Sequence, residues 1–145
     1  MFYGSYRHAV DSKGRVAIPA QYRRDLSGAV IAPGSEGRLV IRPSLEWQQY
    51  VSQFQLTAAS SPEQRSYMRR LYAGARELEL DAQGRMLLSP EHRAFARVGD
   101  RAVFVGLSNV VEVVGEEVWD AESAEFSAAS FTELGDRISR AAPLQ

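Results

Sequence analysis

The chain has 145 residues, of which 45% are hydrophobic and 24% charged, as is ordinary for a globular protein with one core or two very small ones. It contains no cysteine, which excludes disulfides, thiolate metal sites and a cysteine nucleophile, and which fits a reducing cytoplasmic location. The first residues lack the apolar stretch of a signal peptide, and no segment is apolar enough to span a membrane, so we expect no membrane partner.

The net charge of −1 conceals an uneven distribution along the chain. Residues 1–24 carry five basic side chains and one acidic side chain, whereas residues 112–136 carry eight acidic side chains and no basic one. This asymmetry favours either an anionic partner for the first half or attraction between the two ends within an assembly.

The first predicted element is an extended segment over residues 5–10, where apolar and polar side chains alternate. Residues 11–14 then predict a turn. Gly14 can adopt the positive φ of a tight connection, and Asp11 can hydrogen-bond the backbone two residues on. Residues 15–18 are expected to form the return strand.

A short helix is predicted next, from Pro19 to about Leu26, because proline suits the first helical turn. Apolar residues at 30–32 and 39–41 predict two further strands. The glycine-rich segment 33–37 between them is expected to be a loop.

Two helices should follow these strands. Ser44 is predicted to cap the first, whose apolar face is formed by Trp47, Tyr50, Val51 and Phe54. Ser61-Pro62-Glu63-Gln64 is a strong start signal for the second, with a serine cap, proline at the first position and glutamine three residues after the cap. This second helix should end near Gly74.

The second half of the chain repeats the same order of elements. We expect an extended segment at 76–80, a turn at 81–84, a return strand at 85–88, a helix from the Ser89 cap to about Ala96, strands at 102–105 and 110–114 around a turn at 106–109, and a helix from Glu116. The acidic tail over 121–142 is either a helix that folds on contact with neighbours or a segment that frays.

The sequence therefore contains an internal duplication of about 70 residues. Asp11-Ser12-Lys13-Gly14-Arg15 recurs as Asp81-Ala82-Gln83-Gly84-Arg85, and each copy is followed by an apolar run, a proline and an arginine at the same offset. One such unit is too small to bury a core alone. We expect an α+β, mainly β fold in which two hairpins interlock about a pseudo-twofold axis, with 1–74 and 75–145 forming one compact unit.

Catalysis by the two repeated aspartates is disfavoured. Asp11 and Asp81 could meet across the pseudo-twofold, but each has an arginine at i+4 that would pair with it and hold it ionised, which makes a poor proton shuttle. The two histidines have no further ligands at metal-site spacing, and no nucleotide-binding glycine loop is present. We expect no enzyme, no metal and no cofactor.

Binding is the remaining class of function. Lys13 and Arg15 flank a glycine in a turn, and a two-stranded ribbon is narrow enough for the DNA major groove. The Asp11–Arg15 pair would fix the guanidinium, so that less entropy is lost on docking. The alternative is a structural or protein-interaction module in which the pair only locks the turn, and spacing alone leaves both readings open. The cluster Arg65, Arg69 and Arg70 is expected to be a solvated face or a subunit contact.

With these residues, the chain closely resembles the MraZ family, relatives of the AbrB-like swapped-hairpin DNA-binding proteins. The resemblance rests on the two Asp-x-x-x-Arg motifs, the start Met1-Phe2-Tyr3-Gly4 and the segment 43–47. It implies an interleaved double β-hairpin barrel with flanking helices. It also implies a bacterial transcriptional regulator that is associated with the nucleoid and represses the division and cell-wall gene cluster. The resemblance further implies a ring homo-oligomer, such as an octamer or dodecamer, that binds short direct repeats in its own promoter.

The resemblance also implies which residues face double-stranded promoter DNA. We expect DNA contacts from Arg15, Lys13, Gly14, Arg85, Gly84, Gln83 and Arg7, and a structural role for Asp11 and Asp81. Gln83 stands where the first copy has Lys13, which halves the positive charge of the second loop. The first loop is therefore expected to be the stronger contact.

Overall fold

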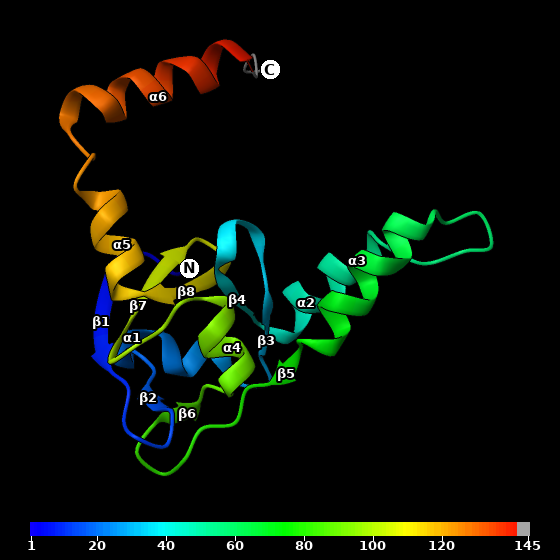
Figure 1. Ribbon diagram of the computed structural model, residues 1–145, viewed down its shortest axis with the longest axis horizontal. Helices are drawn as coiled ribbons and strands as arrows, with labels where there is room; N and C mark the ends of the chain where they lie inside the picture. Colours follow the sequence, from blue (N-terminus) through cyan, green and yellow to red (C-terminus); the bar gives the residue numbers. More distant parts are fainter. Residues whose placement is uncertain (142–145) are drawn as a thin grey trace.

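Two β-sheets form the centre of the computed structural model, which describes residues 1–141 (Figure 1). The larger is antiparallel and has six strands in the order β1-β7-β8-β4-β3-β5. Its strands are β1 (Ser5–Ala9), β3 (Val30–Pro33), β4 (Leu39–Arg42), β5 (Arg76–Glu77), β7 (Arg101–Leu107) and β8 (Val110–Gly115). The smaller sheet pairs β2 (Arg15–Ala17) with β6 (Arg85–Leu87).

The two repeats exchange strands. β1 of the first repeat pairs with β7 of the second, and β5 of the second pairs with β3 of the first. When each strand of the large sheet is replaced by its counterpart in the other repeat, the order becomes β5-β3-β4-β8-β7-β1, which is the original order read in reverse, as a twofold axis requires. This arrangement confirms the predicted mainly β, α+β fold with interleaved repeats about a pseudo-twofold axis.

Within the first repeat, the predicted return strand does not form a ladder with its predecessor. β1 and β2 share only the bridge between Val10 and Val16, because β2 pairs along its length with β6. The backbone hydrogen bonds expected inside one hairpin are thus made between the two repeats. The N–H and C=O groups of β2 are satisfied by β6 instead of by β1.

Helices cover the sheets and extend from them. They are α1 (Ala20–Arg23) with its 3₁₀ continuation η1 (Arg24–Leu26), η2 (Ser35–Gly37), α2 (Ser44–Ser52), α3 (Pro62–Ala73), α4 (Pro90–Phe95), α5 (Glu116–Ser123) and α6 (Ala128–Ala141). The capping box at Ser61 and Gln64 is confirmed, and Ser89 accepts from the backbone of His92 as predicted. The cap predicted at Ser44 is wrong, because the extended backbone of Pro43 takes the cap position and leaves Ser44 as the first helical residue.

Three element boundaries differ from the sequence prediction. The extended segment after α3 is only two residues long, since the chain leaves the sheet after the N–H of Leu78 donates to the Ala29 carbonyl. A 3₁₀ turn, η2, occupies part of the predicted loop 33–37. Gly106 lies in β7 rather than in a turn, because its missing side chain lets the backbone of Tyr3 lie against it.

The main core is shared by the two repeats. Fully buried side chains from the first repeat, such as Val16 and Ile18, pack in one cluster with Met86, Leu88 and Phe104 from the second. A smaller cluster lies where α3 packs on α2 and β3, around Met68 and Leu71, with Trp47, Tyr50, Val51 and Phe54 partly buried against it. Neither repeat could bury the main core alone, since each supplies only one half of it.

The C-terminal segment departs from the body of the molecule (Figure 1). α5 packs on β7 and β8, whereas α6 extends away and has no buried residue. The tail over 128–141 is therefore helical in this structure, and Ala142 lies outside the described residues. No described helix is long and apolar enough to cross a membrane.

Adjacent leucines at the end of β6 test how strongly the shared core governs stability. Leu88 is fully buried, whereas Leu87 is 64% exposed. Leu88→Ala should lower the free energy of unfolding by about 2 to 5 kcal/mol, because it leaves a cavity between the repeats. Leu87→Ala should change it by less than about 0.5 kcal/mol. Urea unfolding followed by circular dichroism measures both, and equal losses would contradict a core shared across the repeats.

Candidate nucleic-acid interface

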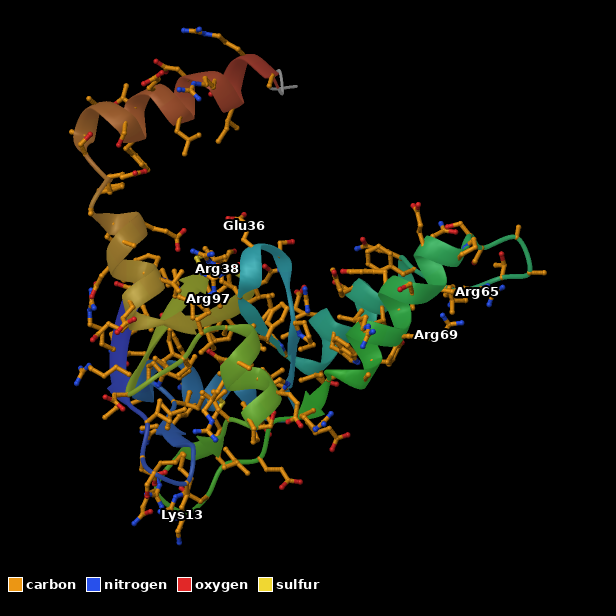
Figure 2. The ribbon with its side chains drawn as sticks, viewed as in Figure 1. Lys13, Glu36, Arg38, Arg65, Arg69 and Arg97 are labelled. Atoms are coloured by element: carbon orange, nitrogen blue, oxygen red, sulfur yellow. The ribbon has the colours of Figure 1, made fainter. Side chains whose placement is uncertain are left out.

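The two repeated turns lie at the same end of the molecule, below the small sheet in the view of Figure 1. Their proximity follows from the pairing of β2 with β6, which each turn directly precedes. The side chains confirm it, since Arg85 Nη1 lies 3.8 Å from Asp11 Oδ2 of the other turn. Lys13 marks the tip of the first turn in Figure 2.

The first turn is organised around the carboxylate of Asp11. Its Oδ1 accepts from the backbone N–H groups of Lys13 and Arg15, both at 2.9 Å, and its Oδ2 accepts from Arg15 Nε at 2.7 Å. The backbone N–H of Gly14 donates to the Asp11 carbonyl at 2.9 Å. One aspartate thus closes the turn and fixes the arginine, as the i to i+4 spacing predicts.

The second turn repeats this geometry closely. Asp81 Oδ1 accepts from the backbone of Gln83 at 2.9 Å and of Arg85 at 3.0 Å, and Oδ2 accepts from Arg85 Nε at 2.8 Å. Gly84 donates to the Asp81 carbonyl at 3.0 Å. The duplicated pentapeptide therefore encodes the same local structure twice.

Each turn is also bonded to the opposite repeat through its glycine. The Gly14 carbonyl accepts from the N–H of Leu88 at 2.8 Å, and the Gly84 carbonyl accepts from the N–H of Ile18 at 3.0 Å. Gly14 has φ +85°, and a Cβ there would lie 2.8 Å from the Leu88 carbonyl oxygen. Glycine is thus needed both for the backbone conformation and for the close approach of the other repeat.

The two aspartates are anions at neutral pH, because their pKa values are lowered in the folded protein. The backbone N–H of Arg15, and secondarily its side chain, lower the pKa of Asp11 to about 2. The backbone N–H of Arg85 lowers the pKa of Asp81 in the same way. Both carboxylates stay ionised near neutral pH, which suits them to hold arginines and not to transfer protons.

Two arginines that the sequence prediction left out of the site lie beneath the turns. Arg23 packs against Gly84, where a Cβ would come within 2.5 Å of its Cζ, and its Nε donates to the Ile18 carbonyl at 2.9 Å. Arg93 packs in the equivalent place against Gly14, and its buried Nε has no hydrogen-bond partner among residues 1–141. Each of these arginines follows the aspartate of its own repeat by twelve residues, and this repeated spacing was the sequence signal that could have assigned them to the site.

Arg7 is placed differently from the loop residues. It lies on β1, where its Nη1 is 3.0 Å from Glu116 Oε2 and its Nη2 is 2.7 Å from Asp120 Oδ1. These bonds, first to Asp120 and then to Glu116, raise the pKa of Arg7 above its ordinary value. Its charge is compensated by two carboxylates of α5.

The remaining candidates for chemistry do not converge on the turns. His92 is buried in α4, and its Nε2 lies 2.7 Å from the Gly74 carbonyl oxygen. His8 packs edge-on against Phe104. Within the part of the chain that the structure describes, no three histidine, aspartate or glutamate side chains are grouped so as to hold a metal ion.

Two adjacent turns, each with an arginine held by an aspartate and each leading into a strand that pairs with the other repeat, define a class of protein: a duplicated swapped-hairpin fold that presents two Asp-x-x-x-Arg loops at one end. The family model described as "MraZ protein, putative antitoxin-like" matches residues 1–70 and again residues 71–140. The chain belongs to the MraZ family.

Curated relatives align over most of the chain and are named "Transcriptional regulator MraZ". The relative from Thermomicrobium roseum is 37% identical over 139 residues, covering 95% of this chain and 97% of the relative. The one from Desulforamulus reducens is 34% identical over 139 residues with the same coverage, and the one from Roseiflexus castenholzii is 40% identical over 120 residues, covering 82% and 84%. The chain is accordingly a transcriptional regulator and not an enzyme.

Acid titration tests whether Asp11 organises its turn. A carboxyl whose pKa is lowered on folding stabilises the folded state above its ordinary pKa of 3.8, and this contribution is lost as the pH falls through its folded pKa of about 2. Asp11→Asn removes the titrating group and the charge pair. We expect the melting temperature of the wild type to exceed that of Asp11→Asn at neutral pH, and the gap to close between about pH 4 and about pH 2. A gap that persists unchanged across this range would contradict the assignment.

Proposed function

We propose that this regulator binds double-stranded promoter DNA sequence-specifically through its two Asp-x-x-x-Arg turns. The observation that carries the proposal is the adjacency of the turns, each with its arginine held by an aspartate and a further arginine packed beneath it. Membership in a family of transcriptional regulators supports a nucleic-acid partner.

The first turn is the stronger candidate for contact with DNA. Lys13 is exposed at its tip, and of the guanidinium nitrogens of Arg15 the Asp11 carboxylate binds only Nε. The two terminal nitrogens of Arg15 have no hydrogen-bond partner among the described residues, so they are available to phosphate oxygens or to the edge of a guanine. Ordering of the guanidinium by Asp11 lowers the entropy lost on binding.

The second turn is proposed to contribute less. Gln83 provides no charge at the position of Lys13, and Arg85 Nη1 lies within 3.8 Å of a second carboxylate, that of Asp11. Part of the charge of Arg85 is therefore neutralised within the protein. Arg7 would also contribute little, since Glu116 and Asp120 already occupy its guanidinium.

We further propose that regulation is repression of the division and cell-wall gene cluster and of the chain's own promoter, at the nucleoid, by a ring homo-oligomer such as an octamer or dodecamer. A chain with a net charge of −1 would bind a polyanion weakly by itself. Several copies facing one duplex add their loop contacts and raise the effective concentration of each. Short direct repeats spaced near one helical turn would present the same face of DNA to successive copies.

Replacement of single arginines tests the ranking of the loops. Arg15→Ala should weaken binding to a direct-repeat promoter fragment by about tenfold or more, because phosphate or guanine contacts are lost. Arg85→Ala should weaken it less. Arg97→Ala is the matched control, since this exposed arginine lies at the opposite end of the body from Lys13 (Figure 2). Gel-shift titration measures all three, and unchanged binding by Arg15→Ala would refute the proposal.

The salt dependence of binding separates DNA recognition from a purely structural role of the Asp–Arg pairs. Each phosphate contact releases counterions, so the logarithm of the binding constant should fall linearly with the logarithm of salt concentration. The slope for Arg15→Ala should be shallower than that of the wild type by about one if Arg15 contacts a phosphate. Fluorescence anisotropy at several salt concentrations measures it. Absence of any salt dependence would favour the structural or protein-interaction module.

A further inference from the structure

The side chain of Arg23, at the end of α1, covers Gly84 in the turn of the other repeat. A Cβ at Gly84 would lie 2.5 Å from Cζ, 2.6 Å from Nε and 2.7 Å from Nη1 of Arg23. Because these three distances are nearly equal, the flat face of the guanidinium, and not its edge, lies against the glycine. A larger residue at position 84 would displace the guanidinium.

Ile18 binds both partners of this contact. Its N–H donates to the Gly84 carbonyl at 3.0 Å, and its own carbonyl accepts from Nε of Arg23 at 2.9 Å. Ile18 is fully buried, so its position is fixed by the core that the repeats share. Arg23, Ile18 and Gly84 therefore form a closed set of contacts in which one face and one nitrogen of the guanidinium are already used.

The backbone at Gly84 decides where the next residue, Arg85, is placed. Gly84 has φ +75°, and glycine has the widest choice of backbone conformations, so its conformation must be restrained by its neighbours. Its N–H and carbonyl are bonded to Asp81 and Ile18, and Arg23 covers its remaining face. A shift of Gly84 would carry the backbone of Arg85 with it and change the direction of that guanidinium.

The equivalent contact beneath the first turn is looser. Arg93 is the counterpart of Arg23, yet a Cβ at Gly14 would lie 3.4 Å from Cζ of Arg93, against 2.5 Å between Gly84 and Arg23. The buried Nε of Arg93 has no hydrogen-bond partner among residues 1–141, whereas Nε of Arg23 is bonded. The clamp formed by an arginine of the opposite repeat is thus complete only beneath the second turn.

We propose that Arg23 is a positioning residue for the DNA contact of the second turn. It fixes Gly84 and thereby the direction from which Arg85 meets DNA, and it acts through Arg85 instead of through its own charge. A restrained loop loses less conformational entropy on docking, which offsets part of the weaker charge of this turn. The inference rests on the proposed function of the turns and adds a residue of the first repeat that controls the loop of the second.

Amide hydrogen exchange of the full chain without DNA tests the restraint. In Arg23→Ala the Ile18 amide should exchange about twofold to tenfold faster than in the wild type, the change expected for one weakened hydrogen bond. The Leu88 amide, which donates to the Gly14 carbonyl in the other turn, is the control in the same sample and should change less. Equal acceleration of both amides, or no acceleration at Ile18, would overturn the inference.

Combined substitutions test whether Arg23 acts through Arg85. In the Arg85→Ala background, Arg23→Ala should change DNA affinity by no more than about twofold, because the side chain that it positions is already absent. In the Arg15→Ala background, it should weaken binding by the same factor as in the wild type. Gel-shift titration of the direct-repeat fragment measures these factors. An equal further loss in both backgrounds, or full binding by Arg23→Ala alone, would contradict a positioning role.

Arg23→Lys separates positioning from direct contact with a phosphate. Lysine keeps the positive charge but lacks the planar group that covers Gly84, so this variant should bind DNA as weakly as Arg23→Ala. In the Arg85→Ala background, Arg23→Ala should also leave the salt slope unchanged, whereas loss of a phosphate contact would lower it by about one. Wild-type affinity of Arg23→Lys, or such a lower slope, would overturn the inference.

Failure of this inference differs from failure of the proposed function. Unchanged DNA binding by both Arg15→Ala and Arg85→Ala would refute the proposed function. If those two variants lose affinity and Arg23→Ala adds an independent loss, only the positioning role is refuted. The exchange measurement contains no DNA, so it tests the clamp separately from any recognition by the turns.

Discussion

The structure depends on two backbone hydrogen bonds that cross between the repeats, from Leu88 to the Gly14 carbonyl and from Ile18 to the Gly84 carbonyl. Each bond joins the turn of one repeat to the strand that follows the turn of the other. The turns are thereby fixed to one another as well as to their own strands. Leu88 and Ile18 are also fully buried, so the same residues that position the turns build the shared core. Stability and the geometry of the loops are consequently coupled.

Electrostatics then make the two turns unequal although their backbones are nearly identical. Asp11 forms an ion pair with Arg15 of its own turn and also lies within 3.8 Å of Arg85 of the second turn. Only the first turn carries a lysine, Lys13, at its tip. The first turn therefore presents more uncompensated positive charge. Duplication followed by change at positions such as Lys13 and Gln83 gives one scaffold with a stronger and a weaker loop.

The same divergence is seen at the other ends of the repeats. In the first repeat, α3 packs on α2 and buries Met68 and Leu71. In the second, α6 keeps an apolar stripe but leaves the body, and α5 has Glu122 and Ser123 where α2 has Tyr50 and Val51. One repeat thus closes on itself, while the other carries an unpaired helix. The loops and this helix lie on different parts of the molecule (Figure 1).

Local chemistry was readable from the sequence, because it depends on residues close together in the chain. The Asp–Arg turns, the caps at Ser61 and Ser89, and the duplication all follow from spacing. Strand pairing could not be predicted in this way, because the backbone donors and acceptors of an extended segment can bond to any other strand. Only the tertiary structure decides that β2 pairs with β6. The places of Arg23 and Arg93 beneath the turns of the opposite repeat depend on that exchange. The sequence by itself determined what each repeat is, and the tertiary structure decided how the two complete each other, because packing joins residues about 70 positions apart.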